Sequence, residues 1–443
     1  MDNYLLVPGN TDLNRGDQAL IWESIRIIKE IDSEADFALL STGETEEEKY
    51  LQSYQTKEMG YKFFNPLVNH PGRGEKEKNK QYYSKVQYIK WGVRAIKDLI
   101  PRVLILPNIK LLNKIGFKFL SEDFTETYSI LKNSKAVIFK GGGFIHSYGA
   151  VTDSYVMFYF LYYAMLAKKF NIKVIFMPNS FGPFRNKLAT ILIKKVLQNV
   201  ELITVREKIS QSALSHVIQK RPPFYPDLGF FMPSDESFDA KGYLKKLKVP
   251  FDKIKVGITV RPYRFDGHPN PEEAYAKYIK SFTEFIEYLI AKHYHPVLIA
   301  QTMGPSYNED DNEAIKLIVS KLKEKHISVI SDGSLNAKKI KKIYSCMNYV
   351  VGTRFHSVIF SLSSNVPSIA ISYGGNKGKG IMEEMGLSEF EIPIEDLSEH
   401  SLIETFKSME LNKDSYISQI ERKMKEYLVA REELKKEIRR VLK

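Results

Sequence analysis

Cysteine is nearly absent from this chain, and long apolar runs are absent too. Cys346 is the one cysteine among 443 residues, so no disulfide can form within the chain, which fits a reducing compartment. The first residues lack a basic stretch followed by a long apolar one, so no signal peptide is predicted. The most apolar segment, residues 155–167, is shorter than the ~20 residues that a membrane-spanning helix needs, which predicts a buried helix. We therefore expect a cytoplasmic protein.

Acidic residues are outnumbered by basic ones, and the excess is concentrated in one segment. The formal net charge is +12, and residues 73–118 carry twelve basic side chains against three acidic ones. Three interpretations stay open for this segment: a solvated loop with helices, an amphipathic element on an anionic membrane surface, and a nucleic-acid contact. Because neither a base-stacking pattern nor a helix-turn-helix pattern accompanies the charge, no nucleic-acid partner is expected. Membrane docking would make the protein peripheral at the inner membrane face.

Short apolar runs alternate with segments of helical spacing along most of the chain. Such alternation predicts an α/β fold with parallel sheets, and a length of 443 residues suggests two domains. We predict an N-terminal α/β domain over 1–232, with the basic segment 73–118 as an insertion, and a C-terminal α/β domain over 253–400. Helices are expected over 401–443. The strands that carry this prediction are expected at 4–7, 36–41, 136–139, 173–177, 202–205, 255–260, 296–300, 327–330, 349–351 and 368–371.

The segment 347–378 carries the most informative motif. A helix is predicted over 355–362, between two strands. Thr353, Arg354 and His356 therefore fall at the first turn of that helix. A helix N-terminus attracts anions because its N–H groups are unpaired and its dipole is positive there, and a guanidinium and an imidazole add to the attraction. The motif predicts a site for a small molecule with more than one negative charge. The alternative is an ordinary strand–helix–strand core with a surface arginine and a capping histidine.

Three other features lie at the ends of predicted strands, where open α/β sheets bind ligands. The triple glycine 141–143 lets a backbone approach a ligand closely, or forms a tight turn. Arg206 is placed to meet a carboxylate or a phosphate, or forms a surface charge pair with Glu207. The loop 11–17 precedes a helix that Asp17 is placed to cap.

These motifs resemble those of the polysaccharide pyruvyl transferase family. The most recognisable is G-T-R-F-H at 352–356, followed by N-V-P-S-I-A-I-S-Y at 365–373 and a lysine before a glycine at 377–378. Residues 42–121 match the family least. Further matches occur in order along the chain: N-x-G-D-x-A-L, the triple glycine, P-x-S-x-G-P-F and V-R-E-x-x-S, at 14–20, 141–143, 178–184 and 205–210.

The resemblance implies an enzyme that moves the pyruvyl group of phosphoenolpyruvate onto two hydroxyls of a sugar. The product is a cyclic ketal on a polysaccharide or on its lipid-linked precursor, and phosphate is released. The resemblance also implies two Rossmann-like domains that face each other across a cleft, in the GT-B type of architecture, with C-terminal helices crossing back. No cofactor and no metal are expected, because the histidines, the cysteine and the carboxylates lack the spacing of metal ligands.

The resemblance further implies roles for individual residues. His356, with Arg354, is the implied catalytic pair, because an imidazole can hold a proton near neutral pH and give it to the vinyl carbon. The implied donor-binding residues are Arg206, Arg354, Lys377 and Thr353. The implied residues on the acceptor side are Asn14, Asp17, Gly141, Gly142, Gly143 and Ser180.

Two other functions stay open at this point. A glycosyltransferase of the GT-B type that uses a nucleotide sugar would hold a diphosphate at the same helix N-terminus. A non-enzymatic scaffold would dock on a membrane through residues 73–118, without any transfer reaction.

Overall fold

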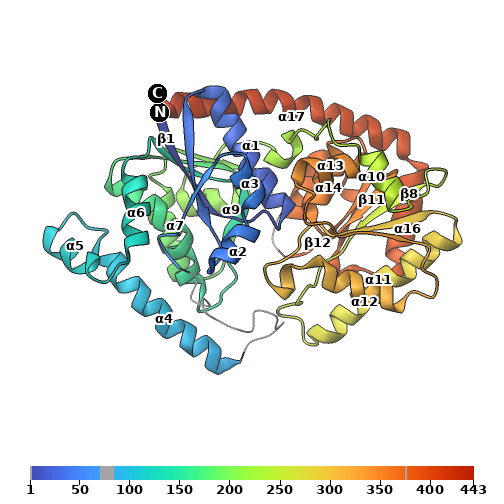
Figure 1. Ribbon diagram of the computed structural model, residues 1–443, viewed down its shortest axis with the longest axis horizontal. Coiled ribbons are helices and arrows are strands. Elements are labelled where there is room, and N and C mark those ends of the chain that lie inside the picture. The colour runs from blue at the N-terminus through green and yellow to red at the C-terminus, as the bar shows by residue number, and fades with distance from the viewer. Residues whose placement is uncertain (1, 70–83, 375–376) are drawn as a thin grey trace. The chain divides into compact units, whose positions relative to one another are not determined.

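The computed structural model describes residues 2–69, 84–374 and 377–443 (Figure 1). Contacts between Cα atoms divide the chain into two compact units. Unit 1 comprises residues 1–12, 20–227 and 430–443, and unit 2 comprises residues 13–19 and 228–429. Of the basic segment predicted over 73–118, residues 73–83 lie outside the described residues.

Unit 1 is built on a parallel sheet that has seven strands among the described residues. Its strands run in the order β3 (Lys62–Phe64), β2 (Ala35–Ser41), β1 (Asp2–Asn10), β4 (Ala136–Phe139), β6 (Lys173–Phe184) and β5 (Gly142–Ser147), and β7 (Leu202–Val205) also pairs with β6. The accompanying helices are α1 (Arg15–Ile31), α2 (Glu46–Leu51), α3 (Tyr54–Glu58), α4 (Lys85–Leu104), α5 (Lys110–Phe117), α6 (Glu122–Lys132), α7 (Asp153–Lys169), α8 (Lys187–Leu197) and α9 (Lys208–Ile218).

Parallel strands covered on both faces read as continuous apolar runs, and unit 1 follows this rule. All four residues of β4 are buried, and the rings of Phe139 and Phe176 stack with centroids 4.0 Å apart across β4 and β6. The apolar segment 155–167 lies within α7 and is buried along much of its length, as predicted. Strand β6 is longer than expected, because β5 pairs with its second half through Gly142–Asn179 and Ile145–Phe181.

Unit 2 is built on a second parallel sheet, with six strands among the described residues. Its strands run in the order β10 (Ser328–Ile330), β9 (His295–Ile299), β8 (Lys255–Thr259), β11 (Tyr349–Gly352), β12 (Ser368–Ser372) and β13 (Glu391–Pro393). The helices are α10 (Ala240–Lys246), α11 (Pro271–Ala291), α12 (Asp311–Lys321), α13 (Ala337–Tyr344), α14 (Phe355–Leu362), α15 (Lys377–Met385), α16 (Glu399–Leu411) and α17 (Lys413–Leu442), with 3-10 turns at η1 (Leu228–Phe231), η2 (Tyr307–Glu309), η3 (Ser388–Phe390) and η4 (Ile394–Asp396).

Both sheets have the doubly wound strand order of a Rossmann-like fold. In unit 2 the chain moves outward from β8 through β9 to β10, then returns to β11 and moves the other way through β12 to β13. Unit 1 repeats this path from β1 to β3 and from β4 to β6. Sheets of this kind bind ligands at the carboxyl ends of the strands, where the order reverses. In unit 2 that point lies between β8 and β11.

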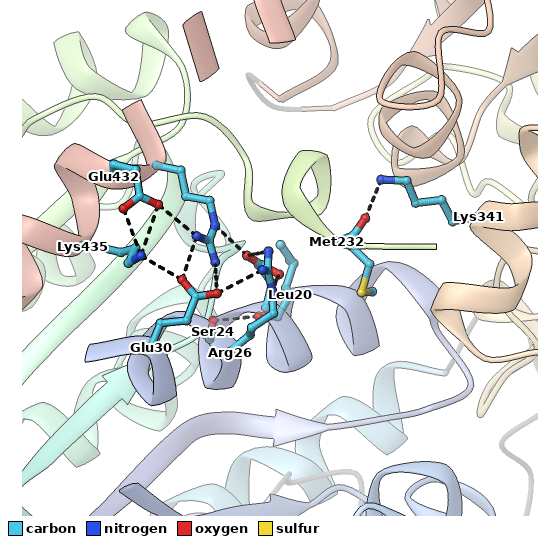
Figure 2. Close-up of polar contacts among 10 residues, drawn as sticks. Leu20, Ser24, Arg26, Glu30, Met232, Lys341, Glu432 and Lys435 are labelled. Atoms are coloured by element: carbon cyan, nitrogen blue, oxygen red, sulfur yellow. Dashed lines mark hydrogen bonds and ion pairs between the residues drawn. The ribbon is translucent and has the colours of Figure 1, made fainter. Parts of the chain in front are cut away.

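The last fourteen residues join unit 1 through a charged network with α1. The Arg431 guanidinium donates through Nε to Glu23 (3.1 Å) and through Nη2 to Glu30 (2.9 Å). Figure 2 shows Lys435 between Glu30 and Glu432, with its ammonium 2.9 Å from an oxygen of each. Glu23 is almost fully buried, and burial raises the pKa of its carboxyl although Arg26 and Arg431 oppose the shift. Among the described residues, no helix is both long enough and apolar enough to cross a membrane.

Candidate functional site

The start of α14 lies at the point in unit 2 where the strand order reverses. Strand β11 ends at Gly352, and the amide of Thr353 donates to the carbonyl of Thr259 on β8 (2.9 Å). The Arg354 amide donates to the hydroxyl of the same threonine (3.3 Å), and α14 begins at Phe355 as predicted. Thr353 is fully buried, and its hydroxyl shares a hydrogen bond with Tyr278 (3.0 Å).

Arg354 is a buried arginine held by a buried carboxylate. Its Nε donates to Oδ1 of Asp311 (2.7 Å), and Oδ2 of Asp311 accepts from the amides of Gln301 and Thr302 (2.9 Å each). Burial alone lowers the pKa of Arg354, but the adjoining Asp311 carboxylate raises that pKa above its ordinary value. Among the described residues, Nη2 of Arg354 has no hydrogen-bond partner. The alternative of a surface arginine is therefore wrong, and one buried amino group of the guanidinium has no hydrogen-bond partner among the described residues.

A second arginine follows β8 at the same edge of the sheet. The Arg261 guanidinium lies over two aromatic rings, 4.6 Å from the centroid of Tyr373 and 5.6 Å from that of Tyr263. Its backbone amide donates to the hydroxyl of Tyr278 (3.1 Å). Its Nε has no hydrogen-bond partner among the described residues. Stacking of this kind fixes a guanidinium while leaving its N–H groups able to bind an anion.

His356 and Lys377 lie side by side. The Lys377 ammonium is 3.2 Å from Nε2 and 3.4 Å from Nδ1 of the imidazole. A Cβ atom placed on Gly16 would lie 2.1 Å from Nδ1 of His356, so the imidazole packs directly against the backbone of Gly16. Glycine is required there because any larger residue would occupy the space of the ring.

Residues 13–19 reach this site because they belong to unit 2. The Met303 amide donates to the Leu13 carbonyl (2.9 Å), and the Arg15 amide donates to the Gln301 carbonyl (3.3 Å). The Asn14 side chain accepts from the amides of Gly16 (3.0 Å) and Asp17 (3.3 Å) and also donates to the Asp17 carboxylate (3.4 Å). Asn14, and not Asp17, thus caps the start of α1.

Glu309 adds a carboxyl group to the same region. It is an exposed residue, yet neighbouring protein removes enough water from its carboxyl to raise its pKa. Arg354 opposes this shift and Asp17 adds to it. A carboxyl group with a raised pKa can accept and return a proton closer to neutral pH than an ordinary glutamate. The described residues contain no cluster of three or more histidine, cysteine and carboxylate side chains that could hold a metal ion.

Arg206 lies in unit 1 and is enclosed there. It is 2% exposed, its Nε donates to Ser180 (2.8 Å), and its Nη1 donates to Asp227 (2.6 Å). Glu207 beside it is fully buried, and burial raises the pKa of its carboxyl although Arg206 opposes the shift. A surface charge pair is therefore the wrong interpretation of Arg206 and Glu207.

The triple glycine also packs against its own unit. Gly142 begins β5, so these residues do not form a simple tight turn. A Cβ on Gly143 would lie 3.2 Å from Nη2 of Arg206, and one on Gly141 would lie 3.1 Å from a methyl group of Leu20. Gly143 and Ser180 thus both adjoin the buried arginine. Of the predicted residues, Asn14, Asp17, Thr353, Arg354, His356 and Lys377 lie in unit 2, whereas Gly141, Gly142, Gly143, Ser180 and Arg206 lie in unit 1.

Sequence reasoning missed three residues of the unit 2 site. Arg261 follows a predicted strand directly, which is the signal that singled out Arg206, so the same rule applied evenly would have found it. Asp310 and Asp311 form an acidic pair of the kind that begins a helix, which conceals their separate roles. Asp310 is the N-cap of α12, and the second acid of the pair is the partner of Arg354. Glu309 gave no sequence signal beyond its acidic neighbours.

Solved structures of similar fold define the class of this chain. S. aureus MnaA, solved with UDP, is 11% identical with a TM-score of 0.56, covering 95% of this chain and 91% of that one. UDP-GlcNAc 2-epimerase of Methanocaldococcus jannaschii, solved with UDP-GlcNAc and UDP, is 12% identical with a TM-score of 0.53, covering 92% of each chain. The glycotransferase of kitacinnamycin is 11% identical with a TM-score of 0.53, covering 100% of this chain and 98% of that one. The fold is thus the two-domain α/β fold of the GT-B type.

Within that class, the sequence identifies the family. The chain belongs to the polysaccharide pyruvyl transferase family, whose model matches residues 14–375. The amylovoran biosynthesis protein AmsJ of Erwinia amylovora is 25% identical over 293 residues, which are 62% of this chain and 65% of that protein. The match with AmsJ therefore spans slightly less than two thirds of that relative.

Proposed function

We propose that this protein transfers the pyruvyl group of phosphoenolpyruvate onto two hydroxyls of a sugar during polysaccharide biosynthesis. The observation that carries the proposal is Arg354, which the Asp311 carboxylate holds through Nε while Nη2 has no partner among the described residues. Family membership and the likeness to a protein of amylovoran biosynthesis support a saccharide acceptor. The acceptor sugar belongs either to a polymer or to its lipid-linked precursor, and the test below includes both.

The donor carries a carboxylate and a phosphate, and unit 2 offers several cations for them. Arg354 and Arg261 each have a guanidinium nitrogen without a partner among the described residues, and both stand at the carboxyl edge of the sheet. A planar guanidinium can bind a carboxylate or a phosphate through two parallel hydrogen bonds. Lys377, at the start of α15, adds a third positive charge beside the imidazole of His356.

His356 is proposed as the general acid. It gives a proton to the CH2 carbon of the donor, which becomes a methyl group, while a sugar hydroxyl forms a bond to the central carbon. The bond from that carbon to the phosphate oxygen then breaks, and a second hydroxyl closes the ketal. One hydroxyl proton restores the proton that His356 gave, and the other leaves with inorganic phosphate, so no oxidant or reductant is consumed. General acid catalysis of this kind contributes a rate factor of roughly 10²–10⁴.

The test is phosphate release from phosphoenolpyruvate against a panel of sugars and lipid-linked saccharides. The wild-type protein should release phosphate with at least one acceptor and form a pyruvyl ketal detectable by mass spectrometry. His356→Gln should lower kcat by roughly 10²–10⁴ while donor affinity, measured by calorimetry, changes little. The exposed His400 offers a control, since His400→Gln should leave both quantities unchanged. Near-normal turnover in His356→Gln would exclude the imidazole as the acid.

A glycosyltransferase that uses a nucleotide sugar is the competing function, because solved proteins of the same fold bind UDP or UDP-GlcNAc. The two functions predict opposite ligands. If this protein is a pyruvyl transferase, phosphoenolpyruvate should raise its melting temperature, whereas UDP and GDP should not. Stabilisation by a nucleotide alone would favour sugar transfer from a nucleotide donor.

A further inference from the structure

Helices α4 and α5 of unit 1 expose a row of large apolar side chains. On α4 these side chains are 44–67% exposed and recur at intervals of three and four residues, which places them along one face of the helix. Beyond α4, Ile109, Leu111 and Phe119 are 51%, 66% and 74% exposed. We call these three residues and the six on α4 the outer face. The six on α4 are Val86, Ile89, Val93, Ile96, Ile100 and Val103.

The opposite side of α4 is fixed to unit 1, so the outer face is exposed by the fold itself. Arg102 is 5% exposed, and its Nε donates to the Leu67 carbonyl (2.6 Å). The Tyr162 hydroxyl of α7 donates to the Arg102 carbonyl (3.1 Å). Ile105, at the end of α4, is fully buried in the core. In Figure 1 α4 is the long light-blue helix that continues into α5.

Positive charge accompanies the outer face. Residues 84–119 contain eight basic residues and one acidic residue, Asp98. Asp98 is paired with Arg102 (3.7 Å), so it does not neutralise the exposed lysines. The exposed lysines adjoining the outer face are Lys90 and Lys97 on α4 and Lys110, Lys114 and Lys118 on and beside α5.

We infer that the outer face docks this protein on an anionic lipid surface. A helix with an apolar stripe bordered by lysines lies in the plane of such a surface, with the stripe in the acyl boundary and the ammonium groups near the headgroups. The spacing of the stripe would also suit a coiled coil with a second copy. A second copy, however, would bring Lys90 and Lys97 toward an equally basic surface, whereas anionic lipids complement their charge. The inference does not depend on the proposed reaction, because no residue of the outer face belongs to the unit 2 site.

The test is co-sedimentation of the full chain with vesicles. The wild-type protein should bind vesicles that contain phosphatidylglycerol, should bind pure phosphatidylcholine much less, and should be released by salt. Ile89→Gln/Ile96→Gln/Ile100→Gln should weaken binding about tenfold or more, because the apolar stripe is lost. Lys90→Gln/Lys97→Gln/Lys114→Gln should weaken it about a hundredfold, since each lysine near an anionic surface contributes roughly a factor of five.

A matched control lies on α8 of the same unit, where Leu188 and Ile191 are 70% and 63% exposed. Leu188→Gln/Ile191→Gln should bind vesicles like the wild type. All variants should keep the wild-type circular dichroism and phosphate release with a water-soluble acceptor, which separates docking from catalysis. The inference would be overturned if the wild-type protein did not bind anionic vesicles, or if the isoleucine variant bound them as well as the wild type. If sedimentation velocity showed a dimeric wild type and a monomeric isoleucine variant, a second copy of the chain would cover the outer face, and the inference would be overturned.

Discussion

At the scale of single residues, Arg354 shows how a buried cation is held in one orientation. The Asp311 carboxylate fixes the guanidinium through Nε and is itself held by two backbone amides. A buried charge that is paired and hydrogen-bonded in this way stays in one orientation before any ligand arrives. Charge alone would not reproduce this arrangement, because a lysine offers no planar fork.

Arg354→Lys should therefore weaken phosphoenolpyruvate binding about tenfold or more, although it keeps the positive charge. Titration calorimetry gives the affinity directly. Arg264, which pairs with Asp266 and is partly exposed, provides the control, because Arg264→Lys in the same unit should leave the affinity unchanged. Equal donor affinity in Arg354→Lys and the wild type would exclude Arg354 as the anchor.

His295 makes the stability of unit 2 depend on pH. It is 7% exposed and contacts Ser328 (2.9 Å), and burial, assisted by Lys253 and Lys255, lowers its pKa from 6.5 to about 4. The folded protein holds the imidazole neutral, so the unfolded chain takes up the proton first as pH falls. The contribution of this imidazole to the free energy of unfolding is fully present above pH 6.5. It falls by roughly 3 kcal/mol in all as the pH decreases toward 4.

Urea unfolding at pH 7 and pH 4.5 measures this dependence. His295→Gln removes the titrating group, so its free energy of unfolding should fall less between the two pH values than that of the wild type. His400→Gln, which changes an exposed histidine of the same unit, is the control and should follow the wild-type curve. Parallel pH curves for His295→Gln and the wild type would contradict the assignment.

At the scale of elements, the site is formed where the first turn of α1 packs against the first turn of α14. The first turn of α1 supplies Gly16, and the first turn of α14 supplies His356, whose ring fills the space beside that glycine. The contact depends on backbone hydrogen bonds that tie residues 13–15 to 301–303. The position of the imidazole is thus set by a segment more than three hundred residues away in the sequence.

Gly16→Ala should displace either the imidazole or residues 13–19, because the new Cβ would lie 2.1 Å from Nδ1 of His356. We expect kcat to fall about tenfold or more, since small displacements of a catalytic group are costly, with a clear loss of thermal stability. Gly92→Ala is the matched control, since Gly92 is also helical and has no atom within 4 Å of its added Cβ. That change should be neutral or stabilising by about 0.5–1 kcal/mol.

At the scale of the whole molecule, the C-terminal residues are part of unit 1. Leu434 and Ile438 are fully buried, and Arg431 compensates the buried carboxylate of Glu23. Deleting residues 430–443 should therefore destabilise unit 1 by about 4 kcal/mol or more, from lost apolar burial and from the loss of one of the two arginines that pair with Glu23. Calorimetry should show the transition of unit 1 moving to lower temperature. Lys436→Ala on the exposed side of α17 should leave it in place.

The fold could be predicted from the sequence because its elements are encoded locally. The β-branched runs at 136–139 and 349–351 became β4 and β11, and the helix predicted at 355–362 has those bounds in the structure. The rest depends on which distant segments meet. Asp311 is 43 residues from Arg354, and Gly16 is farther still from His356, so no periodicity or spacing could pair them. The stacking of Arg261 on Tyr373 likewise exists only once β8 and β12 lie in one sheet.

The chain passes between the two units more than once. Helix α1 begins in unit 2 and continues in unit 1, residues 227 and 228 belong to different units, and α17 begins in unit 2 and ends in unit 1. Cleavage of the chain between residues 227 and 228 would therefore give two incomplete fragments. Fragment 228–443 would lack residues 13–19 of unit 2, which include Gly16, and fragment 1–227 would lack residues 430–443 of unit 1, which include Arg431. Two fragments designed to complement each other would therefore each need to include the missing segment of its own unit, residues 430–443 for unit 1 and residues 13–19 for unit 2.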